Sequence, residues 1–209
     1  RSQSEPEFVP EATEFSVSGA GSDSAVITIP ASVLRDSRVR LDLMKPEYEN
    51  TRKFTLVLPA AELDRHGTIY LDAPRIKMEL PLRSLNGAQV RALGRRDREQ
   101  ASVQMTVEES RGAAAVDLER QLPAGWAAGG PIYRLQAALS SGGQEKELAY
   151  LNERLRLTMK TDLSPNVLLS TLHYYDPSSG GWIPAGHFTA WTGEALLDRF
   201  GFWTMLDQR

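Results

Sequence analysis

The stretch Ser170-Thr-Leu-His-Tyr-Tyr-Asp-Pro-Ser-Ser-Gly-Gly-Trp-Ile-Pro184 decides the fold, because it reads as a strand, a tight turn and a returning strand. The turn at 176–181 contains one proline and two glycines. Proline presets one turn dihedral angle, and glycine admits the positive φ that a return turn requires. Two further strand-type runs, 194–197 and 202–206, follow it. The last third of the chain therefore predicts consecutive β-strands.

Short β-type runs separated by turn residues also fill the chain before this stretch. Several alternate apolar and polar residues, as in Val103-Gln-Met-Thr-Val107, which is typical of a strand with one buried face. The expected strands are 15–17, 25–29, 39–43, 54–58, 68–72, 77–80, 102–108, 131–139, 154–159, 168–175 and 182–183. The pattern predicts an all-β protein, an antiparallel β-sandwich of two lobes with short helical turns at strand ends.

A short motif occurs three times: Ile27-Thr-Ile-Pro30-Ala-Ser-Val-Leu34, Leu56-Val-Leu-Pro59-Ala-Ala-Glu-Leu63 and Met78-Glu-Leu-Pro81-Leu-Arg-Ser-Leu85. Proline ends a strand because it cannot donate a ladder hydrogen bond, and it suits the first turn of a helix. The leucine four residues later then faces the strands. Each motif predicts a strand followed by one helical turn that plugs an end of the sandwich. The alternative is three unrelated strand–turn junctions.

The C-terminal layout resembles the end of β-sandwich modules found beside surface-layer-homology repeats in Gram-positive bacterial cell-surface proteins. The shared features are the Tyr-Tyr-Asp turn, the following Trp182 and the closing strands, and similar Ile-Pro-Ala-x-x-Leu and Leu-Pro-Leu-x-x-Leu phrases occur in those modules. The resemblance covers roughly residues 24–206. It implies a β-sandwich placed next to repeats that anchor the protein to the wall.

The composition divides the chain into four segments. Residues 1–13 are acidic and carry two prolines, which predicts a linker or tail. We expect an N-terminal β lobe at 14–110, a connector rich in alanine and glycine at 111–130, and a C-terminal β lobe at 131–209. The start of the connector favours a short helix that ends near Leu122. Residues 144–152 fit a strand edge or one or two helical turns.

Charge and composition exclude several classes of partner. The chain has 209 residues, a formal net charge of −3 and no cysteine. The first 14 residues carry four glutamates against one arginine, so the rest of the chain is electrically neutral. A neutral body gives no electrostatic reason to expect nucleic acid or an anionic bilayer as the main partner. No apolar run approaches the length of a membrane helix. Because the sequence starts at Arg1 without methionine, we expect a mature or trimmed chain.

The residues that carry chemistry are scattered. His66, His173 and His187 form no metal-ligand spacing, and no nucleotide-binding or Gly-x-Ser-x-Gly motif is present. His187-Phe-Thr189 resembles a self-cleaving tripeptide, but the equivalent family position holds Arg199-Phe-Gly201. A calcium loop near Asp162 or Asp176 lacks the usual ladder of aspartates. We therefore predict no enzyme activity, no cofactor and no metal site.

Two features are candidate ligand-binding sites. The first is a basic loop with Arg91, Arg95, Arg96 and Arg98, because guanidinium groups suit the carboxylates and phosphates of anionic cell-wall glycans. The second is Trp126 with Trp191, because exposed indole faces can stack on sugar rings. The alternatives are a solvated loop and tryptophans used for packing. Trp182 and Trp203 are expected in the core.

These observations favour a non-catalytic structural or interaction module of an extracellular, cell-surface or cell-wall protein. Its expected partners are other domains or proteins of the surface, or an anionic wall glycan. The rival prediction is a carbohydrate-binding module or an accessory domain of a cell-wall-active enzyme. Exposed tryptophan pairs would favour binding, and a pair of carboxylates in a cleft would favour the enzyme.

Overall fold

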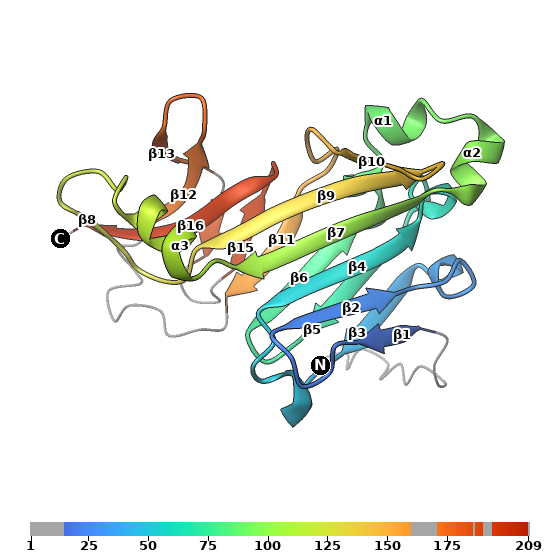
Figure 1. Cartoon of the computed structure of the whole chain (residues 1–209), viewed down its shortest axis with the longest axis horizontal. Coiled ribbons are helices and arrows are strands. Elements are labelled where there is room, and N and C mark those ends of the chain that lie inside the picture. Colours follow the sequence, from blue (N-terminus) through green and yellow to red (C-terminus); the bar gives the residue numbers. More distant parts are fainter. Residues whose placement is uncertain (1–14, 160–170, 186, 190–193, 209) are drawn as a thin grey trace, which may run out of the picture.

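The computed structural model describes residues 15–159, 171–185, 187–189 and 194–208, and these form two β-sheets packed face to face (Figure 1). The predicted all-β sandwich is therefore confirmed. The strands are β1 (Ser16–Ser18), β2 (Ser24–Thr28), β3 (Arg38–Asp42), β4 (Lys53–Pro59), β5 (Thr68–Asp72), β6 (Ile76–Pro81), β7 (Ser102–Glu109), β8 (Trp126–Ala128), β9 (Tyr133–Ser141), β10 (Gln144–Glu147), β11 (Leu155–Met159), β12 (Thr171–Asp176), β13 (Gly181–Pro184), β14 (His187–Thr189), β15 (Glu194–Leu197) and β16 (Gly201–Gln208). The helices are α1 (Ala88–Arg91), α2 (Arg95–Gln100) and α3 (Gly112–Glu119).

The larger sheet has ten strands in the order β1-β2-β4-β7-β9-β16-β12-β13, with β10 added to β9 and β8 added to β16. The smaller sheet has six strands in the order β14-β15-β11-β6-β5-β3. Both sheets are mixed, whereas the sequence predicted antiparallel sheets. The reason is that the chain alternates between the sheets from β2 to β5. As a result β4 returns parallel to β2, and β5 parallel to β3.

One core lies between the sheets. Alternate residues of the strands point inward, such as Leu56 on β4 and Met105 on β7 from the larger sheet, and Leu71 on β5 and Leu157 on β11 from the smaller. All four are fully buried, and removing an apolar side chain of this size from water stabilises the fold by roughly 1.5–3 kcal/mol. The period of two in the sequence thus corresponds to the inner and outer faces of each sheet.

The repeated proline motif has the predicted structure. Strands β4 and β6 end at Pro59 and Pro81, and each is followed directly by a 3-10 helix, Ala60–Glu62 and Leu82–Leu85. After β2 the turn begins at Pro30, whose carbonyl accepts hydrogen bonds from the next turn, and the 3-10 helix is Val33–Arg35. The leucines of all three motifs are buried in the core: Leu34, Leu63 and Leu85.

The connector 111–130 contains α3, as the sequence indicated, and then β8. The strands on its two sides are direct neighbours, because β7 pairs with β9 along eight registered residue pairs. In the smaller sheet, β6 likewise pairs with β11. The division into two lobes at this connector stays a prediction, and the hydrogen bonding crosses it in both sheets.

Candidate functional site

The expected basic loop is helical. Arg91 ends α1, and Arg95, Arg96 and Arg98 lie on α2, so the prediction of a loop was wrong. Alanine, glutamine, arginine and glutamate are strong helix formers, and glycines at 87 and 94 precede the two helices. This local propensity explains the two short helices, which lie at one end of the molecule (Figure 1).

Three of these arginines contact the chain itself. Arg91 donates a hydrogen bond to the Asn152 side chain (3.3 Å), and Arg95 pairs with Glu99 (3.2 Å). Arg98 is only 20% exposed; it donates a 2.6 Å hydrogen bond to Asn86 and lies 3.7 Å from Asp64. Arg98 therefore anchors α2, while Arg91, Arg95 and Arg96 are exposed. Their predicted role in binding an anionic ligand stays a prediction.

The tryptophans divide between packing and a position outside the described residues. Trp203 and Trp182 are both buried, Trp203 in the core between the sheets and Trp182 in a smaller cluster on the outer face of the larger sheet. Each indole N–H donates to a backbone carbonyl. Trp126 is half-buried on β8, with its ring 5.4 Å from that of His173 in an edge-on contact. This contact packs one part of the indole, and the predicted role of Trp126 in ligand binding stays a prediction. Trp191 lies outside the described residues.

A small second cluster covers one half of the outer face of the ten-stranded sheet. It is formed by Leu118 of α3, Ile132, Trp182 of β13 and Leu206 of β16. The indole N–H of Trp182 donates a 3.0 Å hydrogen bond to the carbonyl of Leu118, which fixes α3 against the sheet. Figure 1 shows α3 and β8 beside β12 and β16, at the end of the molecule opposite α1 and α2.

The other half of this face carries a groove of about 420 Å³. It crosses four neighbouring strands, and its lining residues are Lys53 and Thr55 on β4, Gln104 and Thr106 on β7, Gln136, Ala137 and Ala138 on β9, and Glu145 and Glu147 on β10. Short side chains such as Thr55, Thr106 and Ala138 form its floor, and longer ones surround them. This difference in side-chain length explains why the face is hollow here.

The polar groups of the groove are largely available to a ligand. The hydroxyls of Thr55 and Thr106 are 3.0 Å apart and hydrogen bonded to each other. Within the described part of the chain, the side-chain amides of Gln104 and Gln136 make no hydrogen bond. Each amide offers donors and an acceptor. The groove thus combines two carboxamides without hydrogen-bond partners among the described residues, Gln104 and Gln136, with a pair of threonine hydroxyls that bond to each other.

The sequence analysis did not identify this groove. Apart from Ala137, which points into the core, its residues occupy outward positions of four strands at a spacing of two along each strand. That alternation was visible, but it also fits any solvated sheet face. The signal that could have found the site is the register that brings Gln136 opposite Thr106 and Thr106 opposite Thr55, and the register depends on the tertiary fold.

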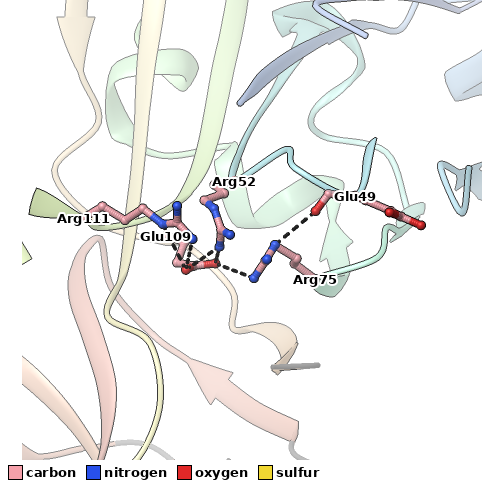
Figure 2. A network of polar contacts seen from close by, with 5 residues as sticks. All are labelled: Glu49, Arg52, Arg75, Glu109 and Arg111. Atoms are coloured by element: carbon pink, nitrogen blue, oxygen red, sulfur yellow. Dashed lines mark hydrogen bonds and ion pairs between the residues drawn. The ribbon is translucent and has the colours of Figure 1, made fainter. Parts of the chain in front are cut away.

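A polar network at another edge joins the two sheets. The side chains of Arg52, Arg75 and Arg111 converge on the carboxylate of Glu109 (Figure 2). One terminal nitrogen of Arg52 lies 2.7 and 2.8 Å from the two carboxylate oxygens, Arg75 lies at 3.6 Å and Arg111 at 3.5 Å. Arg75 also donates to the backbone carbonyl of Glu49 (3.2 Å). Glu109 belongs to β7 of the larger sheet and Arg75 precedes β6 of the smaller, so the network connects the layers.

The histidines occupy three different settings. His66 is exposed in a turn, and His173 is buried on β12. The backbone of His187 lies in β14, and no structure is described for its side chain. His173 lies 3.0 Å from the carbonyl of Thr171, to which its Nδ1–H donates. Burial lowers the pKa of His173, because it disfavours the charged imidazolium, and the hydrogen bond to Thr171 opposes this in part.

The unfolding free energy should therefore fall as the solution is acidified through the histidine range. The pKa of His173 in the folded state lies below its value of about 6.5 in the unfolded state. Above about pH 6.5 both states hold a neutral imidazole and the fold keeps its full stability. As the pH falls from about 6.5 to the folded-state pKa, the unfolded state binds the proton first and the free energy of unfolding decreases. Urea denaturation between about pH 7.5 and 5.5 measures the slope, and His173→Gln should flatten it. His66→Gln, at an exposed position, should leave the slope unchanged. An equal slope in the His173 variant would contradict this assignment.

The segment Arg199-Phe-Gly201 packs against aromatic rings. The Arg199 guanidinium lies 5.1 Å from the centre of the Tyr174 ring, and the Arg199 carbonyl accepts a 3.2 Å hydrogen bond from Trp203. Gly201 has φ of +126°, and a Cβ at this position would lie 2.6 Å from the Tyr174 ring. Only glycine fits this backbone conformation beside that ring.

The two aspartates considered for a calcium loop are Asp162 and Asp176. Asp162 lies outside the described residues. Asp176 caps its own turn: its carboxylate accepts hydrogen bonds from the backbone N–H of Ser178 (3.0 Å) and from the Ser178 hydroxyl (2.7 Å). These bonds from Ser178, together with Ser179, lower the pKa of Asp176. Among the described residues, no group of three or more histidine, aspartate or glutamate side chains is placed to hold a metal ion.

No family model, curated protein or solved structure matches the chain. In the part of the chain that the structure describes, no helix has the length and apolar character needed to span a membrane.

Proposed function

We propose that the chain is a non-catalytic structural and interaction module of an extracellular bacterial cell-surface protein, and that it binds through the groove on the ten-stranded sheet. The observation that carries this proposal is the contrast between the two halves of one face. One half is covered by α3, whereas the other presents polar side chains without hydrogen-bond partners among the described residues, such as Gln104 and Gln136, on adjacent strands. Rigid strands hold such groups with little loss of side-chain and backbone freedom on binding.

The cell-surface location is supported by the resemblance of the C-terminal layout and of the proline motifs to modules beside surface-layer-homology repeats. In such a protein the sandwich would space, display or dock other parts, while separate repeats anchor it to the wall. Two packed sheets with one continuous core suit a spacer, because the element resists bending. A carbohydrate-binding module is the second candidate, and the polar groove favours it.

The purified chain is expected neither to cleave itself nor to hydrolyse wall polymers. Intact-mass analysis after long incubation, alone and with purified cell wall, is the measurement. Two stable fragments produced by cleavage between Phe188 and Thr189 would contradict the proposal and show that the chain cleaves itself. Soluble wall fragments released by the chain would replace it by an enzyme.

The location has a separate test. A tagged copy in a Gram-positive host, with its flanking sequence, should be removed by protease added to intact cells. A cytoplasmic protein in the same cells serves as the control and should survive. Full protection of the tagged chain would contradict the surface assignment.

A further inference from the structure

We propose that the groove binds a neutral, hydroxyl-rich glycan. This inference rests on the proposed function and names the class of ligand that its groove takes. The polar groups, the charge and the size of the groove support it independently.

The hydrogen-bonding groups match sugar hydroxyls. A hydroxyl both donates and accepts, and so does a glutamine carboxamide. Gln104 lies on β7 and Gln136 on the neighbouring strand β9. The residue opposite Gln136 is Thr106, two positions from Gln104 on the same face, so the two glutamines are diagonal neighbours. Diagonal cross-strand neighbours lie roughly 7–8 Å apart, within reach of long side chains. Two carboxamides can therefore bind one ligand from adjacent strands.

The charge of the groove selects against polyanions. Its charged lining residues are Lys53 on one side and Glu145 and Glu147 on the other, so carboxylates outnumber the ammonium group. A glycan rich in carboxylate or phosphate would meet like charge here, whereas a neutral glycan can use both signs as hydrogen-bond partners. The exposed arginines of α1 and α2 are not among the lining residues.

The size and openness suit a polymer. The groove crosses β4, β7, β9 and β10, and three interstrand spacings of about 4.8 Å give a length of roughly 14 Å, more than one hexose ring. Among the described residues no aromatic side chain lines the groove, so we expect hydrogen bonds to provide most of the affinity. We therefore expect weak binding with fast exchange.

Nuclear magnetic resonance titration of the isotopically labelled chain with cellohexaose, maltohexaose and chitohexaose tests the inference. Binding of at least one of them should shift the backbone amide signals of β4, β7, β9 and β10. Gln104→Ala and Gln136→Ala should each raise the Kd about three- to tenfold, the loss expected for one net hydrogen bond. Ala138→Leu, which fills the floor, should abolish binding.

Gln100→Ala, at the exposed end of α2, is the matched control and should leave the Kd unchanged. Urea denaturation should show that all four variants keep their stability, because these side chains lie on outer faces. Absence of groove shifts with all three hexasaccharides overturns the inference and leaves the non-catalytic module intact.

Two further outcomes are informative. The first is binding of polygalacturonate at α1 and α2, seen as amide shifts that are lost in Arg95→Ala and Arg96→Ala and at raised salt. Such binding without groove shifts would overturn the neutral-glycan inference in favour of the arginine surface. Cleavage of a bound hexasaccharide, detected by mass spectrometry, would support the ligand class and contradict the proposed lack of catalysis.

Discussion

Replacing Leu34, Leu63 or Leu85 by alanine is expected to lower the free energy of unfolding by about 2–5 kcal/mol in each variant. Their exposed fractions are 1%, 0% and 0%, and each belongs to the core between the sheets. Truncation removes apolar contacts and leaves a cavity that a close-packed sandwich fills only in part. Urea denaturation of the three variants at neutral pH measures the loss.

Met44→Ala is the matched control, because Met44 is 55% exposed and the substitution also shortens an apolar side chain. Its effect should stay within about 0.5 kcal/mol, as is usual for surface positions. Leucine variants that lose no more than this control would show that the helical turns are incidental to the core. If only one or two of the leucine variants lose much stability, only the corresponding motifs close an end of the core.

The proline motif shows how far local sequence determines structure here. Pro59 and Pro81 have φ of −61° and −60°, which the pyrrolidine ring itself imposes. The end of the strand, the start of the turn and the burial of the leucine all follow from residues within five positions. Strand boundaries were predictable for the same reason, and β5 and β15 coincide with the predicted ranges 68–72 and 194–197.

Features that depend on distant pairing could not be predicted. The parallel pairs β2–β4 and β3–β5 arise because the chain alternates between sheets, and no local residue encodes that choice. Strand β10, the exposed segment Gln-Glu-Lys-Glu, lacks an apolar face and was left open between strand and helix. Its ladder hydrogen bonds with β9 stabilise it as a strand.

The candidate site was harder to predict than the fold. Arginine and tryptophan were chosen by residue type, yet Arg98 anchors a helix and Trp126 packs against His173. The groove is lined mainly by ordinary polar residues, and it exists only because four strands place them side by side. Helix α3 covers the other half of the face because Trp182 bonds to the carbonyl of Leu118, 64 residues earlier in the chain. This contact also depends on the tertiary fold.

Glu109→Gln is expected to cost about 3 kcal/mol of unfolding free energy, the lower end of the range for breaking a buried ion pair. The Glu109 and Arg52 side chains are only 11% and 14% exposed. Glutamine keeps the shape of the side chain but removes the one negative charge on which Arg52, Arg75 and Arg111 converge. The variant therefore leaves three guanidinium groups close together, two of them partly desolvated.

A double-mutant cycle separates this repulsion from the loss of attraction. Arg52→Met in the Glu109→Gln background should recover part of the stability, because it removes the most buried unpaired charge, and the coupling energy should exceed about 1 kcal/mol. Glu99→Gln is the control, since its pair with Arg95 is 58% and 95% exposed and such helix pairs contribute only about 0.3–0.5 kcal/mol. Additive effects of Arg52 and Glu109 would mean that the network in Figure 2 contributes little to holding the two sheets together.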